Sequence, residues 1–344
     1  MRRIERAHLV FVLLFWSVTS TVYSQSPVYL EANTGSRTTI MENGDISVYI
    51  DSKGQVTSME YWGINLLDNG GKIYFSYNDI DTYLELSPGS LKVVKANDDY
   101  AEVVYSSTSG NLKVDQGYIM RKGVSGLYSY VVLRGSANEV TVREMRLGYR
   151  VDPDLFDYGY VTDQMQGYLP TVAVMQEVDD QAIMDATYPL PDGTIYTKYN
   201  WAHYIDQDSV HGMMSNGDGV WAINPSNEYM NGGPMKQELT VHATNKTPII
   251  LQMLQGEHFG SSAQTFGDGD EKIYGPFFIY VNSGSSHEAM VEDAQAQAGK
   301  EKDAWPYSWF SHSLYPQERT TVNGRICLPW DLSSDKVTVA LSQP

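Results

Sequence analysis

Apolar and polar residues alternate with a period of two along most of the chain. Runs rich in Val, Ile and Tyr are separated by Gly, Asn and Asp, which favour turns. This alternation is typical of strands that bury one face. It predicts strands at 46–50, 101–105, 126–132, 140–149, 237–242, 249–254 and 276–281. We therefore expect an all-β fold, and so many strands favour a large β-sandwich over a barrel.

Helical periodicity is rare. The strongest example is 288–300, in which one face carries Met290, Val291, Ala294 and Ala298. Ser285 and Glu288 have the spacing of a capping box and predict the start of this helix.

Residues 1–24 have the pattern of a secretory signal peptide. Three arginines begin the segment, an apolar run follows at 9–16, and Ser24 fits the small-residue cleavage pattern. The run is too short to span a membrane, and no later stretch is long and apolar enough. We expect cleavage after Ser24 and a secreted protein. It would be extracellular, or periplasmic or at the cell surface in a bacterium.

The pattern after the signal predicts one large domain and the start of another. Residues 25–305 read as the β-sandwich, and Trp305-Pro306 marks its end. Strand-like runs at 319–328 and 336–341 then follow. Two strands are too few for a stable domain, so residues 306–344 are interpreted as a linker and the truncated start of a second β domain.

The formal net charge is −18, and Cys327 is the only cysteine. An acidic surface repels nucleic acid and anionic membranes, which excludes both as expected partners. One cysteine allows no internal disulfide, so stability depends on a large core. We also expect a monomer. A polyanionic ligand would need a local cluster of Lys and Arg, which suffices because salt screens distant charges.

The region around Lys198 combines a cation with aromatic and amide side chains. Aromatic faces stack on sugar rings, amides bind hydroxyls and cations hold carboxylates, so this mixture suits a sugar-acid site. Lys198 itself is either a solvent-facing strand lysine or a general base with a lowered pKa.

Histidines and arginines supply further candidates. His258 follows a β run, but His203 and His211 compete with it as the imidazole of a site, and no pair of histidines has zinc-binding spacing. Arg146 and Arg150 share one strand face, whereas Arg143 lies on the other. Either of the first two could clamp a carboxylate.

Acidic residues leave two other interpretations open. Asp268, Asp270 and Glu271 lie in a Gly-rich turn that lacks the spacing of a calcium loop, which favours a solvated turn and no metal site. Glu228 and Glu238 could be the acid pair of a glycosidase.

Several blocks, in the right order, resemble the rhamnogalacturonan lyases of polysaccharide lyase family 4. Residues 120–130 resemble the "RGVSGFYTY" block and 144–147 the "ETRI" strand. Lys198-Tyr199 matches "KY", and residues 210–212 match "VHG". The most specific match is 225–240, which is similar to "PSNEFRSGGPIKQDLT". Residues 258–260 and 274–282 resemble "HYxG" and "YGPYFIYLN".

The resemblance implies a fold like galactose mutarotase, called a supersandwich, followed by a fibronectin-type domain. It implies β-elimination at rhamnose–galacturonic acid bonds of rhamnogalacturonan I, a pectic polysaccharide, without a cofactor. The catalytic Lys and His would be Lys198 as base and His258 as acid, although these labels can be exchanged. Arg146 would neutralise the uronate carboxylate, and Tyr199, His211 and Arg150 would help to bind substrate.

The chain also departs from the family pattern. Residues 163–170 lack the arginines that plant-type members carry there. Two other interpretations therefore remain: a non-catalytic carbohydrate-binding protein on the same fold, and a mutarotase or glycoside hydrolase.

Overall fold

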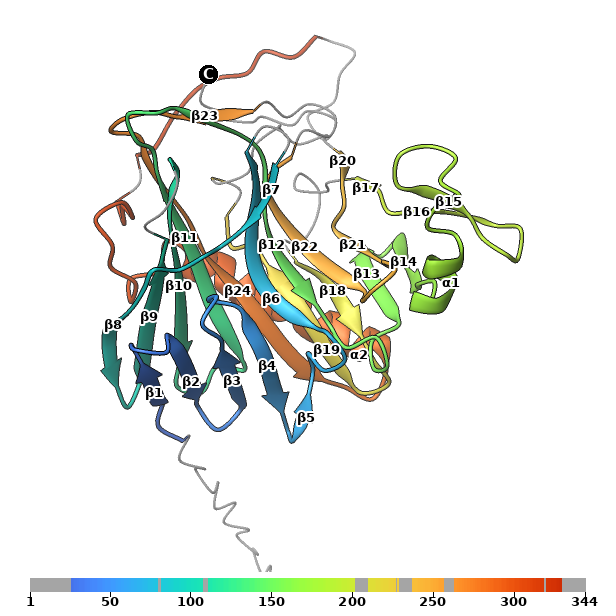
Figure 1. The fold of residues 1–344 in the computed structure, drawn as a ribbon, viewed down its shortest axis with the longest axis horizontal. Coiled ribbons are helices and arrows are strands. Elements are labelled where there is room, and N and C mark those ends of the chain that lie inside the picture. The colour runs from blue at the N-terminus through green and yellow to red at the C-terminus, as the bar shows by residue number, and fades with distance from the viewer. Residues whose placement is uncertain are drawn as a thin grey trace, which may run out of the picture.

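The computed structural model describes residues 26–79, 82–107, 111–201, 210–226, 228, 237–256, 263–318 and 320–329. Within them, two large antiparallel sheets face each other (Figure 1). The predicted all-β sandwich is therefore confirmed. The signal peptide predicted at 1–24 lies outside these residues.

The first sheet places strands from both halves of the chain side by side. Its spatial order is β1 (Tyr29–Asn33), β2 (Thr38–Glu42), β3 (Ile46–Ile50), β4 (Val56–Tyr61), β6 (Lys72–Asp79), β12 (Val140–Arg150), β22 (Ile249–Gln255) and β21 (Val241–His242). Beside β4, β6 and β12 respectively lie β5 (Ile64–Asn65), β7 (Thr82–Glu85) and β23 (Gln264–Phe266).

The second sheet packs behind the first in the view of Figure 1. Its order is β14 (Met165–Tyr168), β13 (Tyr158–Thr162), β18 (Val210–Met214), β19 (Asp218–Ile223), β24 (Glu271–Ser283), β11 (Gly126–Arg134), β10 (Lys113–Arg121), β9 (Tyr100–Ser106) and β8 (Ser90–Asn97).

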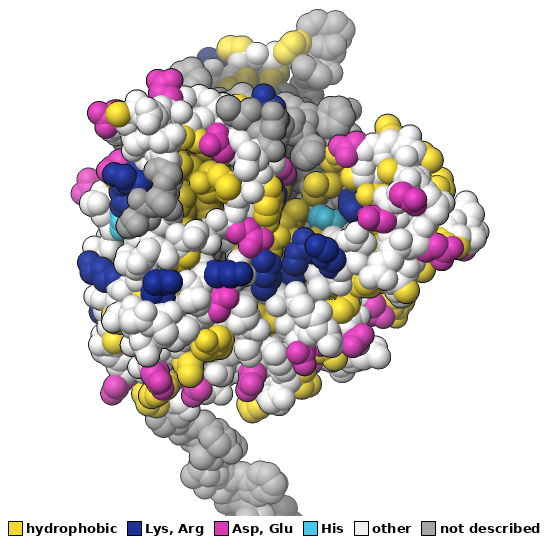
Figure 2. Space-filling view, in the orientation of Figure 1, with side chains coloured by type: hydrophobic (Ala, Val, Ile, Leu, Met, Phe, Trp, Pro, Cys, Tyr) yellow, Lys and Arg dark blue, Asp and Glu magenta, His cyan; other side chains and the backbone are white. Residues whose placement is uncertain are grey.

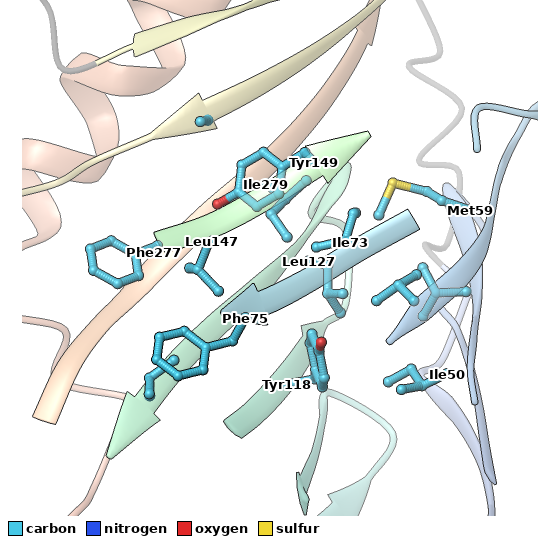
Figure 3. Packing of buried hydrophobic residues seen from close by; sticks show 14 of the residues in the cluster. Ile50, Met59, Ile73, Phe75, Tyr118, Leu127, Leu147, Tyr149, Phe277 and Ile279 are labelled. Atoms are coloured by element: carbon cyan, nitrogen blue, oxygen red, sulfur yellow. The ribbon is translucent and has the colours of Figure 1, made fainter. Parts of the chain in front are cut away.

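The main core fills the space between the sheets. Figure 3 shows Ile73 and Phe75 of β6 beside Leu147 of β12, and they meet Leu127 and Phe277 of the second sheet. All five side chains are fully buried. Burying each such side chain contributes about 1.5–3 kcal/mol. On β12, alternate side chains point to opposite faces, so Leu147 and Tyr149 lie in this core and Arg146 and Arg150 lie on the outer face. The prediction that Arg146 and Arg150 share one strand face is confirmed.

A long helix, α2 (His287–Ala304), covers the outer face of the second sheet. The predicted apolar face is confirmed, because Met290, Val291, Ala294 and Ala298 are buried. The predicted cap was wrong by one residue. Ser286, not Ser285, caps the helix, because its extended backbone lets Oγ accept from the Ala289 N–H at 3.2 Å.

The chain stays packed beyond the predicted boundary at 305. Tyr307 and Phe310 are fully buried against α2 and the second sheet, and the Tyr307 hydroxyl donates to Glu301 at 2.5 Å. The Tyr315 hydroxyl accepts from the Tyr307 N–H at 2.7 Å. The domain boundary itself stays a prediction, but the first compact body includes residues up to Tyr315.

The predicted strand at 319–328 was wrong for the residues described there. Residues 320–329 form no strand and are almost all exposed. No described strand lies beside them to accept their backbone hydrogen bonds, and an isolated strand is not stable. The strand predicted at 336–341 lies outside the described residues.

Deleting the residues after Tyr315 is expected to change the free energy of unfolding by less than about 1 kcal/mol, because the described residues of that segment, 316–318 and 320–329, are almost all exposed. Deleting the residues after Ala304 should lower the free energy of unfolding by more than about 3 kcal/mol, since three buried aromatic side chains, Tyr307, Phe310 and Tyr315, are lost. Urea unfolding of both truncations measures the difference. Equal stabilities would mean that residues 305–315 are not part of the core.

A small arm extends from the side of the sandwich (Figure 1). It contains α1 (Val172–Glu177), β15 (Thr187–Pro189) and β16 (Ile195–Thr197), which pairs with β15. β17 (Asn200–Trp201) then pairs with β20 (Gln237–Glu238). The strand predicted at 237–242 was therefore wrong, because the chain changes partner between β20 and β21. Neither α1 nor α2, the helices of the described ranges, has the length and apolar character needed to span a membrane.

Candidate functional site

Strand register sets a row of side chains across the outer face of the first sheet. Arg150 lies opposite Lys72 of β6 and opposite Ile249 of β22, and Ile249 lies opposite His242 of β21. Directly opposed residues point to the same side of a sheet. These four residues therefore cross four strands in one row. Figure 2 shows Lys and Arg side chains gathered across this face, in an otherwise acidic protein.

Arg146 lies on the same face, but its charge is already engaged. Its Nη1 is 2.9 Å from Oε2 of Glu144, and its Nη2 donates to Oδ1 of Asn78 at 3.4 Å. The guanidinium also lies 5.0 Å from the centre of the Tyr83 ring. An ion pair that is largely shielded from water offers less free charge to an anionic ligand.

The described hydrogen bonds of Arg150 go to neutral groups. Its Nη1 donates to Oγ1 of Thr247 at 3.2 Å and to Oγ1 of Thr244 at 3.4 Å. It forms no ion pair with any carboxylate that the structure describes. Its neighbour Lys72 is paired with Glu85 at 3.0 Å. Of Lys72, Arg146 and Arg150, the cations of these two strands that lie on this face, Arg150 is the one without a described acid as an ion-pair partner.

Lys198 comes from the arm. It lies between β16 and β17, and its N–H donates to the Ala186 carbonyl at 2.9 Å. Its Nζ donates to the Tyr188 hydroxyl at 3.1 Å and lies 4.8 Å from the centre of that ring. Like Arg150, it has no ion pair with a carboxylate among the described residues.

The arm is tied to the first sheet beside β21. The Tyr196 hydroxyl accepts from the Ala243 N–H at 2.7 Å, and Oδ1 of Asn200 accepts from the Val241 N–H at 3.2 Å. A small apolar cluster supports these bonds, with Met175, Val178, Tyr188 and Ala243 buried. These contacts place Lys198 at the edge of the row that contains Arg150.

Tyr199 points its hydroxyl at an acid on the arm. The hydroxyl donates to Oδ2 of Asp185. Burial, this hydrogen bond and the negative charges of Asp185 and Glu144 together raise the pKa of Tyr199.

His242 is a further candidate site residue, which the sequence did not indicate. It is 6% exposed, and its Nδ1 lies 3.0 Å from the Leu239 carbonyl oxygen. Burial lowers its pKa to about 3, and the positive charges of Lys198 and Arg150 add to this effect. His242 is therefore neutral at ordinary pH, with Lys198 and Arg150 both close to it.

His211 lies deeper, between the two sheets. It belongs to β18 of the second sheet, and its Nε2 is 2.8 Å from the Leu251 carbonyl oxygen of the first sheet. Burial lowers its pKa to about 4. This place suits a neutral link between the sheets, and its predicted contact with substrate stays a prediction.

The remaining candidates are placed in part. His258 and His203 lie outside the described residues, as does the side chain of Glu238. Glu228 accepts from Nε1 of Trp305 at 2.8 Å. The acidic turn closes on itself, because the Gly267 N–H donates to Oδ2 of Asp270 at 2.7 Å. The described residues include no cluster of three His, Cys, Asp or Glu side chains that could hold a metal ion.

Comparison with solved structures gives only distant likeness. A putative aldose 1-epimerase from Escherichia coli K12 aligns over 75% of this chain and 99% of its own, with 13% identity and a TM-score of 0.38. An alpha-mannosidase from Enterococcus faecalis aligns over 79% of this chain and 32% of its own, with 11% identity and a TM-score of 0.44.

Comparison of sequences gives a closer likeness. A rhamnogalacturonate lyase of Dickeya dadantii is 34% identical over 299 residues, which are 83% of this chain and 50% of the relative. Rhamnogalacturonate lyase B of Emericella nidulans is 25% identical over 68% of this chain and 39% of the relative. The chain thus spans half or less of the length of these relatives. The model of the rhamnogalacturonate lyase family matches residues 18–189, half of the chain, and the chain therefore belongs to that family.

Proposed function

We propose that this protein is a pectin-degrading lyase that cleaves rhamnose–galacturonic acid bonds of rhamnogalacturonan I by β-elimination. Besides membership of the family, one observation carries the proposal. Arg150 and Lys198 bring two cations without a described carboxylate partner to one neutral histidine, His242, on one face of an acidic protein. This local positive charge suits a sugar that bears a carboxylate.

The reaction needs three kinds of group. A cation at the uronate carboxylate offsets its charge, so that the neighbouring C5 proton becomes more acidic. A base then removes that proton, the C4–O bond breaks and a double bond forms between C4 and C5. An acid gives a proton to the departing oxygen.

The residues fit these roles as follows. Lys198 is the base and takes the C5 proton in its uncharged amine form, since no described acid holds its side chain in an ion pair that requires the charged form. His258, which follows the end of β22 by three residues in the sequence, is the acid. Arg150 holds the carboxylate more directly than Arg146, because Glu144 already occupies Arg146. Tyr199 lines the same site.

The proposal extends to location and partners. The signal pattern at 1–24 supports secretion, to the outside of the cell or to the bacterial periplasm or cell surface. The negative net charge of −18 supports a monomer in solution that avoids nucleic acid and anionic membranes.

An ultraviolet absorbance assay tests the function. Elimination creates an unsaturated uronate that absorbs, whereas hydrolysis, epimerisation and simple binding do not. Absorbance that rises on incubation with rhamnogalacturonan I supports the lyase. No rise, together with measurable binding of the polysaccharide, would favour the non-catalytic binding protein. Reducing ends without absorbance would favour the glycoside hydrolase.

Activity is expected to persist in EDTA. An arginine can neutralise the carboxylate that calcium neutralises in other lyases. The rate of absorbance change with and without chelator measures this. Complete loss of the rate in EDTA, restored by calcium, would contradict the prediction and return attention to Asp268 and Asp270.

A further inference from the structure

The hydrogen bond of His242 fixes its tautomer. Nδ1 lies 3.0 Å from the Leu239 carbonyl oxygen, and a carbonyl oxygen can only accept. Nδ1 therefore carries the hydrogen. The ring is neutral, because burial and the two nearby cations oppose a further proton. Nε2 is thus left with a free lone pair and can only accept a hydrogen bond.

No described group donates to that lone pair. Nδ1 of His242 has a partner, but Nε2 has none among the described residues, and Nε2 is not one of the polar atoms that are buried without a partner. His242 lies opposite Ile249, and Ile249 lies opposite Arg150. The His242 ring is therefore on the same outer face of the first sheet as Arg150. The face therefore presents an acceptor beside the cations Arg150 and Lys198.

A uronate sugar matches this pairing of groups. Its carboxylate needs cations, and its ring hydroxyls are the donors that a neutral imidazole nitrogen can accept. A protonated histidine in this place could accept nothing. His242 therefore does not act as a third cation that binds the carboxylate; it offers a hydrogen-bond acceptor instead.

We propose that His242 contacts the substrate directly, with Nε2 accepting a hydrogen bond from a hydroxyl of the uronate sugar whose carboxylate Arg150 holds. This inference rests on the proposed function for the identity of the sugar. It makes His242 a residue that selects the sugar by its hydroxyl, whereas Arg150 selects it by its charge.

Two substitutions separate this role from a purely structural one. His242→Asn places an amide N–H where Nδ1 was, so the bond to Leu239 is kept and the Nε2 acceptor is lost. His242→Gln extends an amide oxygen towards the position of Nε2 and gives up the bond to Leu239. His287→Asn, at the start of α2 on the second sheet, is the matched control.

The measurements are binding of rhamnogalacturonan I oligosaccharides by calorimetry, kcat and KM in the absorbance assay, and the melting temperature. For the asparagine variant we expect about 3- to 10-fold weaker binding, as for loss of one hydrogen bond to a neutral group, with an unchanged melting temperature. The glutamine variant should bind better than the asparagine variant despite a lower melting temperature.

Wild-type binding by a folded asparagine variant would overturn the proposal. So would a loss of binding in both variants that simply follows their melting temperatures, because that pattern marks a structural role. The calorimetric readout does not depend on turnover. If the wild-type protein binds the oligosaccharide but forms no unsaturated product, the proposed lyase activity fails while the comparison of variants still tests His242.

Discussion

Replacing Lys198 by alanine is expected to lower the rate of unsaturated product formation by about 10²–10⁴-fold, the usual effect of removing a general base. The fold should survive, because the described hydrogen bond of the Lys198 ammonium goes to the Tyr188 hydroxyl on the arm and not to the main core. The initial rate of absorbance change measures the effect, and circular dichroism checks the fold. His258→Ala is expected to cause a loss of the same size.

Lys92→Ala is a suitable control, since Lys92 is an exposed lysine on β8 of the second sheet. It should keep the wild-type rate. If the Lys198 variant also turns over at nearly the wild-type rate, Lys198 is not the base. His211 and His203 would then be the next residues to replace.

Replacing Arg150 by glutamine is expected to lower kcat/KM by about 10²–10³-fold, comparable to the loss of one group that stabilises developing negative charge. The kcat/KM of Arg150→Lys should lie between those of the wild type and Arg150→Gln. Lysine keeps the charge but cannot bind a carboxylate with two parallel hydrogen bonds. Steady-state kinetics on rhamnogalacturonan I measures both variants.

The comparison that decides this assignment is the double variant Glu144→Gln with Arg146→Gln. It removes one charge of each sign from the face, so its loss should be smaller than that of Arg150→Gln. A larger loss in the double variant would give the neutralising role to Arg146, as the family resemblance implies.

The sequence predicted those parts of the site that depend on one strand alone. On β12 the period of two is sufficient to place Arg146 and Arg150 on the same face, because strand geometry fixes the direction of alternate side chains. The same period places Glu144 beside Arg146, two residues away on β12. It could not show that Arg150 hydrogen-bonds to threonines, because those come from the loop at 244–247, far along the chain.

His242 shows the limit most clearly. In the sequence it ends the strand predicted at 237–242, just after the block at 225–240, and nothing there marks it as a site residue. Its proposed role comes from the register that links β12, β22 and β21. Residues 151–240 separate β12 from the other two strands along the chain. A change of pairing partner at 239–240 also separated it from the strand to which the sequence assigned it. The acceptor that His242 offers could be found only once the sheet was assembled.

The two halves of the proposed site belong to units of unequal size. Arg150 and His242 are part of the large sheet, whereas Lys198 belongs to an arm held by a two-stranded sheet and a few apolar side chains. Such small units open locally at a lower free energy than the whole domain. On warming, the arm is therefore expected to open first. Turnover would then cease while the sandwich, with its ability to hold a carboxylate, remains folded.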